Sequence, residues 1–189
     1  MDIRELSYNC QNKTNQITMK NNLILILCLF FFINESCQTN QKELTESNVE
    51  EIIGSASEVV KKVFDYSNDL DFETGLNYYS DASNAYFITD GKMKSLSDLR
   101  EEYRAVGLSV ESLHNKIESW HAQVLTEDVV NFTLPVQLTL KLKGIPEFTG
   151  KLVWTATLQK LDNEWMIVQS HESWLNCAEV AAALLPVSG

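Results

Sequence analysis

The feature that most limits the fold of this chain is a strict alternation of apolar and other residues between Val130 and Lys143. The apolar residues at every second position are Val130, Phe132, Leu134, Val136, Leu138, Leu140 and Leu142. A period of two places all of them on one face of a β-strand. Pro135, on the other face, indicates an edge, a bulge or a bend because it has no N–H to donate. A strand of this length must curve if its apolar face wraps around helices.

Two more strands are predicted after this one. Residues 144–148 form a turn, and Lys151 to Leu161 returns with apolar residues at alternate positions. A second turn at Asp162-Asn163 leads to a last strand from Glu164 to Trp174. Strands that follow one another through short links pair antiparallel, so the C-terminal half is expected to be one antiparallel sheet.

The preceding segment has helical periodicity instead. Apolar residues recur every three to four positions over 47–68, which predicts a long amphipathic helix, with Ser47 and Glu50 as its capping box. A short second helix follows, capped by Asp71. Residues 85–89 are expected to form a short strand. A third helix is predicted to begin after Ser95, supported by Asp98 three residues on, and to stop at Gly107.

Two segments resemble a known superfamily. AYFITDGKMKSLSDLREEY (85–103) and NEWMIVQSHES (163–173) are similar to segments of the nuclear transport factor 2-like superfamily, in its SnoaL-like and calcium/calmodulin kinase association-domain-like group. The resemblance covers about residues 47–175. It implies an α+β fold shaped as a cone, with about three N-terminal helices packed on a strongly curved, mostly antiparallel sheet. The superfamily includes isomerases, dehydratases, cyclases, binding modules and assembly domains, so the fold does not fix the function.

The last strand supplies the candidate site residues. Counting by twos from Trp165 brings Gln169, His171 and Ser173 to the same face, which by the resemblance looks into the cone. His171 is then the candidate for acid/base chemistry, the alternative being a hydrogen-bonded His that braces the fold. The same count turns Glu172 outward. Without an inward carboxylate, chemistry of the ketosteroid isomerase type is not expected.

The other residues expected around the pocket are aromatic: Trp154, Tyr79 and Tyr86. The leading hypothesis is a domain that binds a small apolar molecule or a protein partner. The alternatives are a SnoaL-like enzyme that uses His171, and a homo-oligomer, such as a homodimer, whose polar outer sheet face is the functional surface. A cavity of several hundred Å³ would favour a ligand or a substrate.

The N-terminus has the pattern of a targeting segment. Residues 23–33 (LILILCLFFFI) are apolar, too short to span a bilayer and matched in length to the core of a signal peptide. Lys20 precedes this run, and Met19 is the favoured start of translation. The run ends at Ser36-Cys37, which resembles the lipobox of bacterial lipoproteins, where the Cys carries the lipid.

The predicted organisation is therefore a leader and signal peptide (1–36), a polar tether (37–46), the domain (47–175) and an apolar tail (176–189). The resemblance places the protein at the cell envelope, anchored to a membrane through Cys37. A periplasmic or secreted protein released from its signal is the alternative.

Charge and cysteine content limit the partners, crosslinks and cofactors that the chain is expected to have. The net charge of −11 disfavours nucleic acid. Of the four Cys residues only Cys177 lies within the mature chain beyond Cys37, which excludes an internal disulfide framework. The sequence has no paired Cys and His motif for zinc and no phosphate-binding glycine loop, so neither a metal nor a cofactor is expected.

Overall fold

The computed structural model describes residues 44–89, 91–175 and 178–180. Its contacts divide the chain into one unit of residues 1–43 and another of residues 44–189. The predicted signal peptide, the lipid site at Cys37 and most of the tether lie outside the described residues. Within the described part of the chain, no helix is both long enough and apolar enough to cross a membrane.

The long N-terminal helix is α2, Glu46–Asn68. Its N-cap is Thr45, whose side chain accepts a hydrogen bond from the backbone N–H of Asn48. The expected capping box at Ser47 is therefore corrected, because Ser47 already lies inside the first turn. Ala56 and Val60 are fully buried beneath the sheet, as the helical periodicity predicts.

Two shorter helical segments complete the helical layer. α3 (Phe72–Gly75) runs into the 3-10 helix η1 (Leu76–Tyr78), and Asp71 caps α3 as predicted. α4 spans Leu96–Gly107, with the predicted capping box between Ser95 and Asp98. The two predicted helix starts after Asp71 and Ser95 and the stop at Gly107 are confirmed.

The sheet has seven strands. Their bounds are β1 Tyr86–Thr89, β2 Lys92–Lys94, β3 Val110–Ile117, β4 His121–Thr126, β5 Val129–Leu142, β6 Phe148–Leu161 and β7 Glu164–Trp174. Their order is β2-β1-β7-β6-β5-β3, with β4 also paired to β5. All neighbours are antiparallel except β1 and β7, which run parallel. The expected α+β fold with a curved, mostly antiparallel sheet is confirmed.

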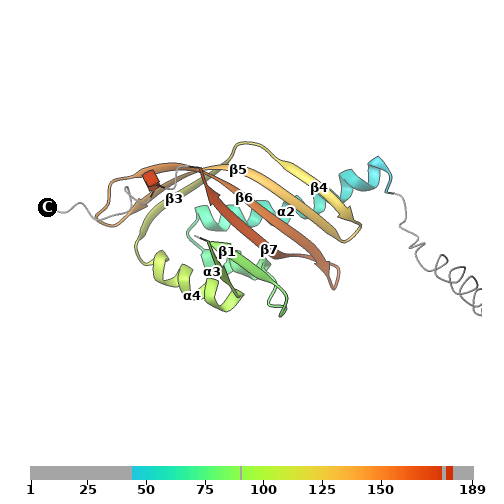
Figure 1. Cartoon of the computed structure of the whole chain (residues 1–189), viewed down its shortest axis with the longest axis horizontal. Helices are drawn as coiled ribbons and strands as arrows, with labels where there is room; N and C mark the ends of the chain where they lie inside the picture. The colour runs from blue at the N-terminus through green and yellow to red at the C-terminus, as the bar shows by residue number, and fades with distance from the viewer. Residues whose placement is uncertain (1–43, 90, 176–177, 181–189) are drawn as a thin grey trace, which may run out of the picture. The chain divides into compact units, whose positions relative to one another are not determined.

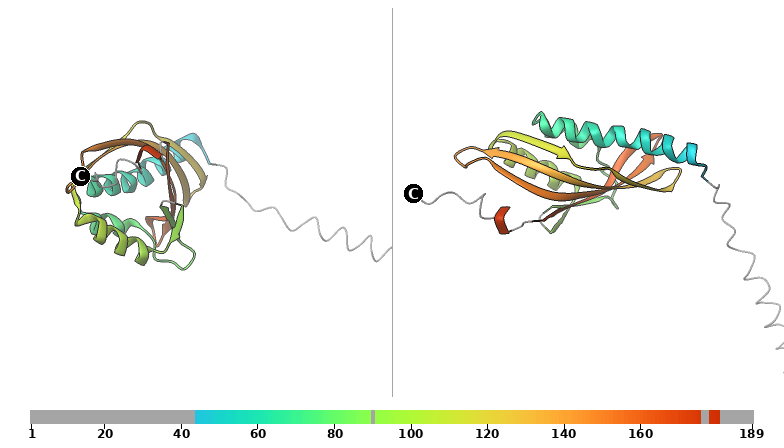
Figure 2. Two further views of the ribbon diagram at one scale, coloured as in Figure 1. Left: turned by 60° about the vertical axis from the view of Figure 1, so that its left-hand side comes forward. Right: turned by 90° about the horizontal axis from the view of Figure 1, so that it is seen from above.

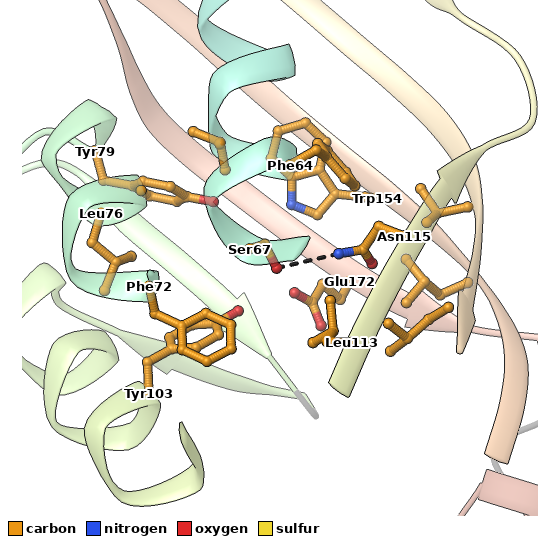
Figure 3. A pocket seen from close by; sticks show the side chains of 15 residues that line it. Phe64, Ser67, Phe72, Leu76, Tyr79, Tyr103, Leu113, Asn115, Trp154 and Glu172 are labelled. Carbon is orange, nitrogen blue, oxygen red and sulfur yellow. Dashed lines mark hydrogen bonds between the residues drawn. The ribbon is translucent and has the colours of Figure 1, made fainter. Parts of the chain in front are cut away.

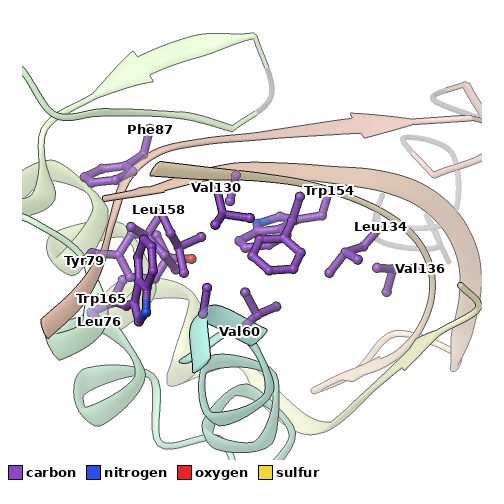
Figure 4. Close-up of a cluster of buried hydrophobic side chains, with 14 of the residues drawn as sticks. Val60, Leu76, Tyr79, Phe87, Val130, Leu134, Val136, Trp154, Leu158 and Trp165 are labelled. Carbon is purple, nitrogen blue, oxygen red and sulfur yellow. The ribbon is translucent and has the colours of Figure 1, made fainter. Parts of the chain in front are cut away.

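Curvature gives the sheet an inner and an outer face. β5, β6 and β7 arch over α2 in Figure 1, and Figure 2 shows the sheet curling around this helix. The alternating apolar residues of β5 all turn inward, and those from Val130 to Val136 have at most 1% of their surface exposed. With Trp154 and Leu158 of β6 they form the core against α2 (Figure 4). At the other end of the cone the inner face is less completely filled.

Candidate functional site

A cavity of about 190 Å³ lies between the helices and the inner face of the sheet. Most of its lining side chains are aliphatic or aromatic. The five aromatic ones come from α2, α4, β6 and the segments around α3 and η1: Phe64, Phe72, Tyr79, Tyr103 and Trp154. Its larger polar side chains are Asn115 and Glu172, with Ser67 beside them (Figure 3). The cavity is smaller than the several hundred Å³ expected of a ligand or substrate site, and His171 does not line it.

The aromatic side chains pack against one another. Phe64 and Trp154 meet edge to face, with ring centroids 5.4 Å apart. The ring centroids of Phe72 and Tyr103 are 5.1 Å apart, and this pair lies on another side of the cavity. Such pairs add about 0.5–1.5 kcal/mol beyond the area they bury, so the wall is well fixed before any ligand arrives.

Glu172 reaches the cavity because β7 contains a bulge. Thr157 of β6 pairs with Gln169, whereas the next residue, Leu158, pairs with Ile167. Val168 is therefore an extra residue, and the alternation of faces restarts after it. Cross-strand partners share a face, so Glu172 lies on the inner face with its partner Trp154, which is 4% exposed.

The same bulge corrects the expected placement of the polar residues of this strand. His171 pairs with Thr155, and Ser173 with Val153, which alternate with the buried residues of β6. Gln169 pairs with Thr157 on that outer face and with Tyr86 of β1. None of Gln169, His171, Ser173 and Tyr86 lines the cavity, whereas the expected wall residues Trp154 and Tyr79 do.

The sequence held a sign of this bulge. Trp165 and Trp174 are both large apolar residues that suit the inner face, but they stand nine positions apart. An odd separation cannot bring both to one face of a regular strand. In the structure Trp165 is buried and Trp174 packs against the core, which the extra residue makes compatible. Counting back by twos from Trp174 would have placed Glu172 on the inner face.

The negative charge of Glu172 acts on the phenol group of Tyr79. Burial raises the pKa of the Tyr79 phenol, and the negative charge of Glu172 raises this pKa further, while a hydrogen bond with Ser170 acts in the opposite direction. Tyr79 therefore stays a neutral phenol over the whole physiological range of pH. It can both donate and accept a hydrogen bond at the cavity wall.

Asn115 is held in place by the end of α2. Its backbone N–H donates to the side-chain oxygen of Asn68 at 2.6 Å, and its own side-chain Nδ2 donates to Ser67 Oγ at 3.2 Å (Figure 3). Ser67, which accepts this bond, keeps its hydroxyl proton for another acceptor. The polar side of the cavity is thus built from α2, β3 and β7 together.

The described residues form no cluster of metal-binding side chains at this site. Among the described residues, no group of three His, Cys, Asp or Glu side chains lies close enough to hold a metal ion. Glu172 is the only residue lining the cavity that carries a full charge. The chemistry that this arrangement offers is hydrogen bonding and proton transfer through one carboxylate inside an aromatic wall.

Comparison with known proteins places this fold in a family. A family model described as a SnoaL-like domain matches residues 57–176, which is more than half of the chain. The chain belongs to the SnoaL-like domain family. This SnoaL-like domain has no match among curated proteins.

Solved structures with similar folds are numerous but distant in sequence. The hexachlorocyclohexane dehydrochlorinase LinA-type3 from Novosphingobium barchaimii LL02 has a TM-score of 0.60 at 11% identity, covering 69% of this chain and 91% of its own. A nuclear transport factor 2-like superfamily protein from Salmonella enterica serovar Typhimurium LT2 has a TM-score of 0.60 at 14% identity, covering 67% of this chain and 92% of its own. A ketosteroid isomerase-like protein from Erwinia carotovora atroseptica has a TM-score of 0.58 at 15% identity, covering 66% of this chain and 97% of its own. At such identities the likeness shows the fold alone.

Proposed function

We propose that this SnoaL-like domain binds a small, largely apolar molecule in its cone. The observation that carries the proposal is the cavity of about 190 Å³ with five aromatic side chains in its wall. An apolar cavity of roughly 150 Å³ is large enough for benzene. The expected ligand is therefore about the size of one substituted six-membered ring, held by the aromatic wall and oriented by Glu172.

A second candidate function is proton transfer, with Glu172 in the role first considered for His171. The observation that favours it is the carboxylate on the inner face beside the neutral phenol of Tyr79. A carboxylate in a mostly apolar site is a typical general base, and a phenol can donate to a developing oxyanion. Dehydrochlorination and ketosteroid isomerisation, which appear in the names of two structural neighbours, are reactions of this class.

Cyclohexanone in D₂O separates the two functions. Binding alone should raise the melting temperature of the domain without faster exchange of the protons beside the carbonyl. A general base should also speed that exchange above the buffer rate, as followed by NMR. Glu172→Gln should then abolish the exchange, while His171→Gln, an adjacent change on the outer face, should leave it intact. If neither benzene nor cyclohexanone shifts the melting temperature, the binding proposal is contradicted.

We also propose that the domain is displayed at the cell envelope through a lipid on Cys37. The support is the sequence: an apolar run of signal-peptide length ends shortly before a Ser-Cys pair. A periplasmic or secreted form, released from its signal without a lipid, is the competing location.

Finally, we propose that two copies associate through the outer face of the sheet. The support is a patch across β1, β7, β6, β5 and β4 that contains no Asp, Glu, Lys or Arg. We call this the outer patch; its residues are Tyr86, Ile88, His121, Gln123, Asn131, Thr133, Pro135, Val153, Thr155, Thr157, Gln169, His171 and Ser173.

A further inference from the structure

We propose that the cavity selects neutral ring alcohols, and that Ser67 and Asn115 recognise the hydroxyl group of the ligand together. This inference rests on the binding function proposed above and specifies its ligand class. It is drawn from the hydrogen bonds at the polar side of the cavity, where the end of α2 meets β3.

The backbone of Asn115 is held at two points. Its N–H donates to the side-chain oxygen of Asn68 at 2.6 Å, and its carbonyl oxygen accepts from the side-chain nitrogen of Asn68 at 3.5 Å. The amide of Asn68 thus bonds to β3 through both of its polar atoms. Asn115 is therefore presented to the cavity from a fixed backbone, and less ordering is needed when a ligand binds.

The side-chain amide of Asn115 has a defined direction. Its Nδ2 donates to Ser67 Oγ at 3.2 Å, which leaves its Oδ1 as the acceptor end. Among the hydrogen bonds of the described residues, none uses this oxygen. Figure 3 shows the side chains of Ser67 and Asn115 reaching toward each other at one side of the cavity.

The hydroxyl proton of Ser67 is the matching donor. Ser55 and Ser57 of the same helix donate to backbone carbonyls three residues earlier, at 3.0 Å and 2.9 Å, as serines in helices commonly do. Within the described part of the chain, Ser67 makes no such bond, and its oxygen accepts from Asn115 instead. The proton of Ser67 is therefore available to an acceptor in the cavity.

A ligand hydroxyl fits between these two groups. Its oxygen accepts from the Ser67 hydroxyl, and its proton goes to Asn115 Oδ1, each at the usual O–H···O separation of about 2.7–2.8 Å. The hydrogen bonds then form a closed cycle, from Asn115 Nδ2 to Ser67, from Ser67 to the ligand, and from the ligand to Asn115 Oδ1. Every donor meets an acceptor in this cycle, and each bond polarises the next. The cycle uses no atom of Glu172.

Other ligand groups complete only part of the cycle. A ketone accepts from Ser67 but has no proton for Asn115 Oδ1, and an ammonium group donates to Asn115 but cannot accept from Ser67. A hydrocarbon leaves both protein groups unpaired. A site built to bond a hydroxyl discriminates against analogues that lack it for this reason. The aromatic and aliphatic remainder of the wall contacts the ring of the ligand.

Cyclohexanol, cyclohexanone and benzene test the proposal. They offer the cavity a donor and an acceptor, an acceptor alone, and neither. Calorimetry or ligand-observed NMR with the purified protein should show cyclohexanol binding about tenfold more tightly than cyclohexanone. Asn115→Leu should weaken cyclohexanol about tenfold and change cyclohexanone and benzene by less than about threefold. Ser67→Ala should weaken both oxygen-containing ligands, since both accept from its hydroxyl, and leave benzene unchanged.

Asn131→Leu is the matched control. Asn131 lies on the outer face of β5 and also donates from Nδ2 to a hydroxyl oxygen at 3.2 Å, that of Thr157. The same substitution there removes the same kind of bond away from the cavity, so all three affinities should be unchanged. Circular dichroism verifies that each variant folds, and Ser67→Ala provides the test if Asn115→Leu does not fold.

Hydroxyl selection is overturned, while the binding function stands, if cyclohexanone binds the parent as tightly as cyclohexanol does. It is also overturned if Asn131→Leu weakens cyclohexanol as much as Asn115→Leu, or if neither cavity variant weakens it. If none of the three molecules binds, the binding function fails and hydroxyl selection fails with it.

Discussion

Glu172 and His171 are neighbours in the chain, yet they face opposite sides of β7. One extra residue, Val168, decides which of the two meets the cavity. Bulges are frequent beside functional sites because they re-aim side chains without breaking the sheet. Here the bulge exchanges an imidazole for a carboxylate and so changes the chemistry available to a ligand.

Ser95 and Asp98 make a residue-scale prediction about pH. The hydroxyl of Ser95 and then its backbone N–H bond to the Asp98 carboxylate and hold the pKa of Asp98 below its usual value of 3.8. A folded pKa below the unfolded one stabilises the fold above pH 3.8, and this contribution is lost as the pH falls through the folded value. Asp98→Asn should therefore reduce the unfolding free energy at pH 7, with a smaller deficit in strong acid.

Urea unfolding at pH 7 and at several acidic values measures this difference. Ser95→Ala is the companion variant, expected to cost about 1 kcal/mol at pH 7 as the loss of an N-cap does. A deficit for Asp98→Asn that stays constant into strong acid would contradict the role of the ionised carboxylate in the cap.

The placement of individual side chains around the cavity was the feature that the sequence predicted least well. Trp154 and Tyr79 were found as cavity residues because large aromatic residues in this fold have few other places to go. Gln169, His171 and Ser173 were misplaced because a period of two, counted across an undetected bulge, inverts every later side chain. Tyr86 was expected at the pocket because it is aromatic, but in β1 it is the neighbouring Phe87 that is buried on the inner face. Asn115 and Ser67 carried no local signal, since only tertiary packing brings β3 to the end of α2.

At the scale of elements, periodicity was a reliable guide. α2, α4, β5, β6 and β7 lie where the helical and alternating patterns predicted them, because each buries one continuous apolar face. The short strand β2 was not predicted, since three residues give too few repeats to define a period. The N-cap of α2 lies at Thr45 instead of Ser47, an error within the usual uncertainty of helix ends.

Two glycines provide an element-scale prediction with a built-in control. Gly54 lies inside α2, and an added Cβ would meet nothing within 4 Å. Gly54→Ala should stabilise the domain by about 0.5–1 kcal/mol through helix propensity. Gly150 of β6 is buried, and an added Cβ would approach the Phe148 ring to 2.7 Å and the Trp174 ring to 2.9 Å. Gly150→Ala should destabilise by about 1–3 kcal/mol through overpacking.

Thermal and urea denaturation of the two variants measure the change in unfolding free energy, which should have opposite signs for the same Gly→Ala substitution. If Gly150→Ala were as stable as the parent, the two rings would not be packed over Gly150, and the inner face at this end of the cone would need revision.

At the scale of the whole molecule, the first prediction concerns the anchor. Cys37→Ser removes the thiol that would carry the lipid, so the protein should move from the membrane fraction to the soluble or precursor pool of a bacterial host. Intact mass should show the loss of the lipid. Cys177→Ser is the control, because Cys177 follows the last strand and lies far along the chain from the predicted signal segment. Equal fractionation and equal lipid mass for Cys37→Ser and the parent would reject the anchor.

The second whole-molecule prediction concerns the outer patch. One row of it crosses five strands through registered pairs: Ile88, His171, Thr155, Thr133 and His121. Charged residues of this face lie outside the outer patch: Lys151 pairs with Glu118 toward the β3 end, and Glu164 lies at the start of β7. Two copies of a chain with a net charge of −11 repel, and a face without fixed charges is where they can approach most closely.

The chemistry of the outer patch suits such a contact. Thr, Asn, Gln and Ser side chains both donate and accept, so the patch is complementary to itself, as a two-fold interface requires. Five strands about 4.8 Å apart, each contributing a stretch of three to five residues, span roughly 20 Å by 15 Å. This is on the order of 300 Å² of flat sheet before side-chain relief is counted, so the patch would be the centre of an interface whose standard size is roughly 800 Å² per partner.

Thr155 lies in the middle of this row, so Thr155→Lys would bring two like charges together across a two-fold axis and should convert a dimer to a monomer. Thr149→Lys is the matched control: it makes the same change on the same strand and the same face, but at the charged end of the sheet. Light scattering coupled to size-exclusion chromatography of residues 44–189 measures the mass of each. A parent that is monomeric at high concentration, or a Thr155→Lys variant that remains dimeric, would show that the outer patch does not join two copies.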